Sequence, residues 1–142
     1  MKKNAKEQRR SRGFTLLEMM VVVMIIGLLA AMVVPNLLRN KDRANQKKAL
    51  ADIVALESAL DLYYLDHNRY PTTAEGLNIL KAPDNQSEGY LKRIPQDPWG
   101  RPYQYLSPGH HGRIDIFSWG EDGKEGGTGA AADIGNWNVG MF

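Results

Sequence analysis

The chain has 142 residues, of which 43% are hydrophobic and 24% charged, and its formal net charge is +2. This length supports one domain of ordinary size. Cysteine is absent, which excludes disulfides, thiolate metal sites and thiol catalysis.

The positive charge is concentrated at the N-terminus. Residues 1–13 carry six basic side chains and one acidic side chain, a net charge of +5, whereas residues 14–142 carry a net charge of −3. The basic character therefore belongs to a short leader and not to a folded surface, and we expect no nucleic-acid partner.

Residues 14–34 form a long apolar run, FTLLEMMVVVMIIGLLAAMVV, in which Glu18 is the only charged residue. As a helix this run is about 30 Å long, which matches the hydrocarbon thickness of a bilayer. The basic leader orients its own side of the span toward the cytoplasm. The alternative is a cleavable secretory signal peptide, which usually has a shorter apolar stretch and an A-x-A-like cleavage site. No such site follows residue 34, and we predict a retained membrane span.

Glu18 is an unusual residue in this run, because a carboxylate inside an apolar span costs about 2.5–3.5 kcal/mol. One explanation is that it lies at the membrane edge without a role. The other is that cleavage after Gly13 exposes a positively charged amine, which neutralises Glu18 of a neighbouring copy. Such a pair favours one axial register between parallel helices.

The residues from Arg12 to Glu18, RGFTLLE, resemble the leader and cleavage motif of the type IV pilins and pseudopilins. The resemblance implies that a prepilin peptidase cleaves between Gly13 and Phe14 and N-methylates Phe14. It also implies that residues 1–13 are a cytoplasmic leader, and that Glu18 guides subunits into a growing filament.

A second helical segment is predicted at residues 44–65. Its apolar residues recur in steps of four and three, at Ala49, Ile53, Leu56, Leu60 and Tyr63. This stripe is expected to pack on a globular head. Pro35 is expected to kink or break the helix between the two segments, and Pro71 ends the second segment.

The remaining head combines short elements. A short helix is expected after Thr73, with Leu77 and Leu80 facing the core. Strands at 102–106 and 113–119, joined by a Gly/Pro turn, predict an antiparallel hairpin. Within that turn, His110 and His111 are either metal ligands or a pH switch, or simply exposed; no carboxylate partner is evident nearby, which favours exposure.

The C-terminal segment 119–137 reads WGEDGKEGGTGAAADIGNW and is rich in glycine and acidic residues. One interpretation is a disordered loop, because such small side chains bury little apolar surface. The other is a calcium site, since calcium takes carboxylate and backbone carbonyl ligands. The spacing of the acids differs from the helix–loop–helix calcium motif, and the lack of cysteine and of clustered histidine argues against zinc.

Nearly the whole chain resembles the major-pseudopilin family of type II secretion, within the type IV pilin-like superfamily. The matching segments are 70–73, 76–77, 89–91, 97–100, 102–103, 118–120, 122–123, 132–134 and 136–137. The resemblance implies an α+β fold with a long N-terminal helix, membrane-spanning in its first half, on a small antiparallel sheet. The implied parts are the leader 1–13, a transmembrane or filament-core helix 14–38, and a periplasmic head 39–142.

The resemblance also implies a calcium ion (Ca²⁺) in the C-terminal loop, in place of the disulfide of ordinary type IV pilins. Asp122 and Asp133 are then side-chain ligands and Trp119 is a backbone ligand. The carbonyls of Lys124 and Thr128 are further candidates.

The implied function is that of the major structural subunit of a pseudopilus in a Gram-negative bacterium. Copies form a helical homopolymer through the N-terminal helix and help to export folded proteins across the outer membrane. The implied partners are the inner membrane, the prepilin peptidase, the minor pseudopilins and the inner-membrane assembly platform.

Other functions remain as alternatives. These are a type IV pilus-like pilin and an anchored periplasmic binding domain. An enzyme is not expected, because the chain has three histidines, two of them in a turn, and no G-x-S-x-G motif.

Overall fold

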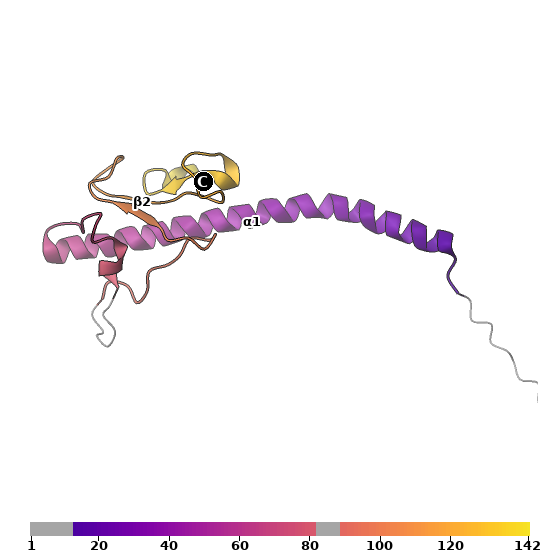
Figure 1. Ribbon diagram of the computed structural model, residues 1–142, viewed down its shortest axis with the longest axis horizontal. Coiled ribbons are helices and arrows are strands. Elements are labelled where there is room, and N and C mark those ends of the chain that lie inside the picture. Colours follow the sequence, from indigo (N-terminus) through magenta and orange to yellow (C-terminus); the bar gives the residue numbers. More distant parts are fainter. Residues whose placement is uncertain (1–12, 82–88) are drawn as a thin grey trace, which may run out of the picture. The chain divides into compact units, whose positions relative to one another are not determined.

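The structure, a computed structural model, describes residues 13–81 and 89–142. It contains two compact units, Met1–Leu38 and Arg39–Phe142, and helix α1 (Leu16–His67) contributes to both (Figure 1). The helix is continuous past Gly27 and Pro35, so the expected break at Pro35 does not occur. A proline removes one N–H from the helical ladder, a loss that apolar membrane helices tolerate through local backbone adjustment and other partners for the freed carbonyl.

In the first unit, α1 is an exposed apolar helix. Its most apolar 18-residue window has a mean hydropathy of 2.7 and none of it is buried within the chain. By length and composition this helix can cross a membrane. An apolar surface of this size requires lipid or other protein chains to cover it.

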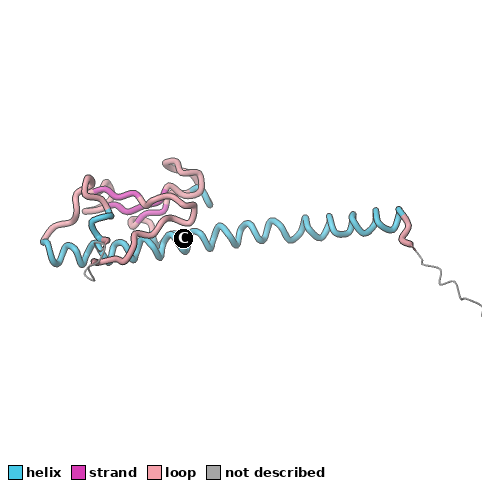
Figure 2. Tube along the Cα trace, turned by 60° about the horizontal axis from the view of Figure 1, so that its bottom comes forward, coloured by secondary structure: helices cyan, strands magenta, loops and turns pink. Residues whose placement is uncertain are grey.

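The head unit contains a three-stranded antiparallel sheet in the order β1-β2-β3, formed by β1 (Gln104–Leu106), β2 (Asp115–Ser118) and β3 (Ile134–Gly135) (Figure 2). Tyr105 of β1 pairs with Ile116 of β2, and Ser118 of β2 pairs with Ile134 of β3. The predicted β1–β2 hairpin is confirmed. Strand β3 lies in the glycine-rich C-terminal segment and is not predicted by the sequence pattern.

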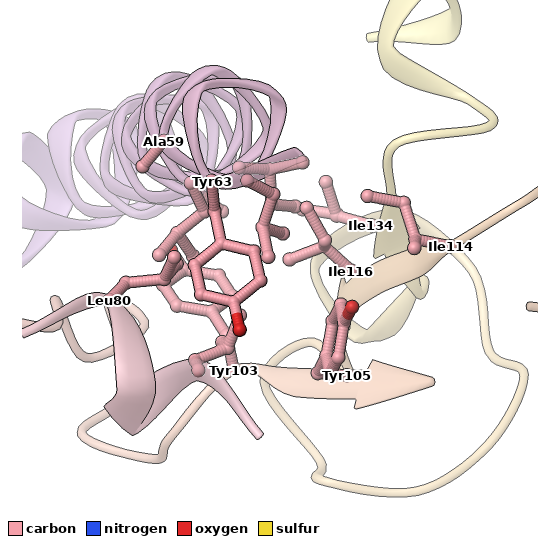
Figure 3. Close-up of a cluster of buried hydrophobic side chains, with 13 residues drawn as sticks. Ala59, Tyr63, Leu80, Tyr103, Tyr105, Ile114, Ile116 and Ile134 are labelled. Carbon is pink, nitrogen blue, oxygen red and sulfur yellow. The ribbon is translucent and has the colours of Figure 1, made fainter. Parts of the chain in front are cut away.

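The core of the head lies between α1 and this sheet (Figure 3). All five residues of the predicted α1 stripe are buried, as are Leu77 and Leu80 at the two ends of the 3-10 helix η1 (Leu77–Leu80). Ile116 and Ile134 close the core from the sheet side. Fully burying one such aliphatic side chain stabilises the fold by about 1.5–3 kcal/mol.

Two further 3-10 helices lie near the C-terminus, η2 (Gly129–Ala131) and η3 (Val139–Met141). They flank β3 in the chain, so the segment that carries the predicted calcium ligands ends on an ordered strand.

Candidate functional site

The predicted processing residues directly precede helix α1. Gly13 and Phe14 lie before its first residue, and the Phe14 side chain is 76% exposed. The remainder of the predicted leader lies outside the described residues. The bond between Gly13 and Phe14 therefore lies outside the helix, next to its start.

Glu18 belongs to a capping box at this helix start. Oγ1 of Thr15 accepts a hydrogen bond from the Glu18 N–H at 3.1 Å, and Oε2 of Glu18 accepts one from the Thr15 N–H at 3.5 Å. The two side chains thereby satisfy N–H groups that a helix start leaves without partners. Reasoning from charge alone misses this local role, although the Thr-x-x-Glu spacing is its signal.

The C-terminal loop, residues 119–133, is held together by hydrogen bonds to backbone carbonyls. The Arg101 guanidinium donates to the carbonyl of Gly120 at 2.7 Å and to that of Glu121 at 2.8 Å. The Glu121 N–H donates to the Ala130 carbonyl at 3.0 Å. The Glu121–Ala130 bond joins the two arms of the loop, and the Arg101 bonds tie the first arm to the segment before β1. The loop therefore has a defined conformation despite its small side chains.

Two positions of this loop require glycine, because neighbouring atoms lie too close to leave room for a Cβ atom. Gly120 has a φ of +64°, and a Cβ atom there would lie 2.7 Å from the Ala132 carbonyl oxygen. Gly123 has a φ of +66°, and its Cβ atom would lie 2.8 Å from Cζ of Arg101. A larger residue at either position would force the loop to open.

Asp133, a predicted ligand, has one satisfied and one unsatisfied carboxylate oxygen. Oδ2 accepts a hydrogen bond from the Gly126 N–H at 2.7 Å. Oδ1 is buried and has no hydrogen-bond partner among the described residues. A buried carboxylate oxygen without a partner is destabilising, and a bound cation removes that penalty.

The other predicted ligands lie in the same loop. Asp122 is exposed, and its Oδ1 accepts a hydrogen bond from the Lys124 N–H at 3.1 Å. The Thr128 carbonyl accepts one from the Ala131 N–H at 3.2 Å. Trp119 lines a cavity of about 380 Å³ together with Asp133.

Glu125, which is not among the predicted ligands, lines that cavity as well. Within the ranges that the structure describes, no three His, Asp or Glu side chains converge as a metal-binding group. A cation in this loop therefore needs backbone carbonyls in addition to carboxylates. This mixed donor set fits calcium, which binds oxygen ligands of both kinds.

The turn histidines are exposed, as expected, but they have a carboxylate partner. The Asp115 carboxylate accepts hydrogen bonds from the backbone N–H of His110 at 2.7 Å and of His111 at 3.1 Å, and it lies 3.0 Å from Nδ1 of His111. Burial by itself raises the pKa of Asp115, but these hydrogen bonds outweigh it, so the pKa lies below its ordinary value. The His111 ring also stacks on Trp137, with ring centroids 3.9 Å apart.

Known proteins match both units of the chain. The model of the family "Type II secretion system (T2SS), protein G" matches residues 36–137, and that of the "Prokaryotic N-terminal methylation motif" matches residues 8–34. The type II secretion system core protein G of Vibrio cholerae is 59% identical over 144 residues, which cover 96% of this chain and 99% of that protein. The Aeromonas hydrophila protein of the same name is 58% identical, with the same coverage.

A solved structure agrees with the fold. The major pseudopilin from the type 2 secretion system of enterohaemorrhagic Escherichia coli is 52% identical, with a TM-score of 0.61 over 76% of this chain and 95% of that chain. Its similarity confirms the predicted pilin-like α+β fold, a long N-terminal helix with a small antiparallel sheet. Both the family model and the relatives agree on one assignment: the chain belongs to the type II secretion system protein G family, the family of the major pseudopilin.

Proposed function

We propose that copies of this chain polymerise through the N-terminal part of α1 into a helical pseudopilus that helps to export folded proteins across the outer membrane. The observation that carries this proposal is the long apolar helix, of which no part of the most apolar window is buried within the chain. Such a surface is covered by lipid before assembly and by other copies after it.

Before assembly, a prepilin peptidase cleaves between Gly13 and Phe14 and methylates the new amine of Phe14. The match to the methylation motif over residues 8–34 supports this step. The exposure of Phe14 next to the helix start supports it as well. The processed chain is held in the inner membrane with its head in the periplasm.

During assembly, the amine of Phe14 in one copy pairs with the Glu18 carboxylate of its neighbour. In the single chain, Glu18 caps its own helix with Thr15. The carboxylate therefore exchanges a local partner for an intermolecular one. Pairing of opposite charges in an apolar environment is favourable only where the two charged groups are in direct contact. This requirement selects one axial register between subunits.

A calcium ion binds the C-terminal loop through the side chains of Asp122 and Asp133, with backbone oxygens of Trp119, Lys124 and Thr128 as the other candidates. The buried Oδ1 of Asp133, which has no partner among the described residues, supports this assignment. When bound, the ion supplies a cross-link of oxygen ligands between the two arms of the loop. The stiffened loop then presents a fixed surface to the next head.

The chain acts as a structural protein and not as an enzyme, in keeping with its family. Its working partners are the minor pseudopilins and the inner-membrane assembly platform, and a cytoplasmic ATPase supplies the energy. The family assignment favours this function over a type IV pilus-like pilin or an anchored binding domain.

The variants Glu18→Gln and Glu18→Ala test the assembly step. Glutamine keeps the capping box but removes the charge, whereas alanine removes both. We expect both variants to be processed to methylated Phe14, measured by mass spectrometry, and neither to form filaments, measured by shearing and electron microscopy. Glu121→Gln, which changes an exposed acid of the head, is the control and should assemble. Normal filaments from Glu18→Gln would show that the charge pair is not needed.

A further inference from the structure

The first ten residues of the head unit are strongly basic. Residues 39–48 carry five basic side chains and one acidic side chain, a net charge of +4. All five basic side chains are exposed. Among the described contacts, only Lys48 of these five forms an ion pair, with Asp52 at 2.7 Å. The other four cations are therefore available to an external anion.

Three of them share one face of α1. Arg39, Arg43 and Lys47 are spaced by four residues, and side chains at this spacing lie one above the other along a helix. We call these three residues the basic face. A regular row of cations is a surface that can contact several anionic groups at once.

An apolar side chain lies next to the basic face. A hollow of about 330 Å³ is lined by Arg43, Gln46, Lys47 and Phe142. Phe142 is 47% exposed. The C-terminal end lies beside α1 (Figure 2). Cations next to an exposed aromatic side chain are typical of surfaces at a membrane interface.

The C-terminal segment is tied to this part of α1 by Gln46. Its Nε2 donates a hydrogen bond to the Gly129 carbonyl at 2.8 Å. This contact comes from the same helical turn as Arg43 and Lys47, so it holds the segment around Gly129 near the basic face.

The position of the basic face in the chain is unusual for a membrane protein. Basic residues normally accumulate on the cytoplasmic side of a span and are depleted on the other side. Here the leader has a net charge of +5 and the head-side flank has +4. Since the head-side charge works against the orientation signal, we infer that it has a separate use.

The length of the span places Arg39, the first residue of the basic face, at the headgroup layer. The 25 residues from Phe14 to Leu38 are about 38 Å long as a helix, against about 30 Å of hydrocarbon. Arg39 follows directly, at the depth where lipid phosphates lie. Anionic headgroups attract juxtamembrane Lys and Arg side chains through their phosphates.

We propose that the basic face of Arg39, Arg43 and Lys47, together with Phe142, binds the phosphate groups of anionic phospholipids on the head side of the membrane. This inference rests on the proposed insertion of α1 in a membrane. Lipid binding here holds the subunit at a fixed depth before assembly. Extraction into a filament then requires these phosphate contacts to break.

The test measures lipid selectivity at the protein surface. The full chain is reconstituted into phosphatidylcholine vesicles that contain a trace of spin-labelled phosphatidylglycerol or, in parallel samples, spin-labelled phosphatidylcholine. Electron paramagnetic resonance then gives the fraction of each lipid that the protein immobilises. For the wild-type chain we expect a preference for phosphatidylglycerol of about 2- to 5-fold that falls with added salt.

A charge-matched pair of variants makes the test specific. The triple variant Arg39→Gln/Arg43→Gln/Lys47→Gln should lower the preference well below that of the wild-type chain because its phosphate contacts are lost, leaving only what the leader and the remaining cations contribute. The control Lys92→Gln/Arg93→Gln/Arg113→Gln removes three exposed cations elsewhere on the head and should keep the wild-type preference. The leader is unchanged in all samples, so its charges contribute equally.

Three results would overturn the proposal. The first is a wild-type preference for phosphatidylglycerol in the basic-face variant. If that variant also fails to assemble into filaments, the basic face contacts a neighbouring copy and not lipid. The second is equal loss in both variants, which indicates general electrostatics. The third is displacement of the labelled lipid by millimolar inorganic phosphate, which indicates a site for free anions. Extraction of the wild-type chain by alkaline carbonate, measured on the same vesicles, would instead refute membrane insertion itself.

Discussion

Asp133 accepts a hydrogen bond from the Gly126 N–H through Oδ2, while its buried Oδ1 has no partner among the described residues. The bond fixes the carboxylate, so Oδ1 cannot turn toward another donor without breaking it. A positioned and desolvated carboxylate oxygen is the arrangement expected of a metal ligand whose orientation is set by a neighbouring hydrogen bond.

Calcium should therefore stabilise the wild-type head. Binding to the folded state alone contributes about 2.7 kcal/mol at a ligand concentration 100 times Kd, which corresponds to a rise in Tm of roughly 10 °C or more for a head of this size. Asp133→Asn and Asp122→Ala should abolish this rise. The measurement is thermal unfolding of the full chain in detergent, with calcium or with a chelator.

Glu121→Gln is the matched control for this prediction, since it removes an acid of the same loop that is not among the proposed ligands. It should keep the calcium-dependent rise in Tm. Equal melting temperatures of the wild-type chain with calcium and with chelator would rule out the calcium assignment.

Arg101 should be essential for the loop conformation. Its guanidinium binds the carbonyls of Gly120 and Glu121 at the same time, and a lysine ammonium lacks the planar fork that makes this possible. We expect Arg101→Lys to destabilise the head by about 1–3 kcal/mol in urea unfolding and to increase proteolysis within the loop. Arg113→Lys, at an exposed position, is the control. Unchanged proteolysis in Arg101→Lys would mean that other contacts hold the loop.

Thr15 should stabilise the start of α1. Thr15→Val keeps the shape of the side chain but removes the oxygen that accepts the Glu18 N–H bond. The expected loss is about 0.5–2 kcal/mol of local stability, measured as faster hydrogen exchange of the first amides of α1 in detergent micelles. Thr15→Ser retains the acceptor and should exchange like the wild-type chain. If Thr15→Val also exchanges at the wild-type rate, the capping box does not stabilise the helix start.

Much of the fold follows from local sequence rules. The stripe from Ala49 to Tyr63 has helical spacing, and the chain buries it as predicted. The β1–β2 hairpin follows from alternation on either side of a Gly/Pro turn. Both features depend on periodicity over several residues, which a single sequence displays directly.

Other features depend on contacts that periodicity does not reveal. Strand β3 has only two residues and forms because β2 offers a free edge to Ile134. Pro35 does not end the helix, which continues to His67. The partner of His111 is Asp115, four residues further on, but the turn must fold before the two groups meet. The buried Oδ1 of Asp133, without a partner in the described part of the chain, likewise takes its position only once the loop closes around it.

Asp115 should make the head sensitive to acid. Its pKa is lowered in the folded chain, so the carboxylate contributes stability above its ordinary pKa of 3.8, and this contribution is lost as the pH falls through the folded value. Replacing Asp115 with asparagine should remove about 1–3 kcal/mol at neutral pH, because the buried acceptor for the His110 and His111 N–H groups loses its charge. The measurement is the free energy of unfolding as the pH is lowered from neutral to well below the ordinary pKa of 3.8.

The variant and the wild-type chain should converge as the pH falls through the lowered pKa of Asp115 in the folded chain, because protonation then gives both a neutral side chain at this position. Asp42→Asn, on α1, is the control and should follow the wild-type curve. Glu75, whose pKa is lowered to about 2 by its hydrogen bond with Arg69, stays unchanged in all three chains and cancels in the comparison. Parallel curves for Asp115→Asn and wild type throughout this range would show that the Asp115 charge does not stabilise the turn.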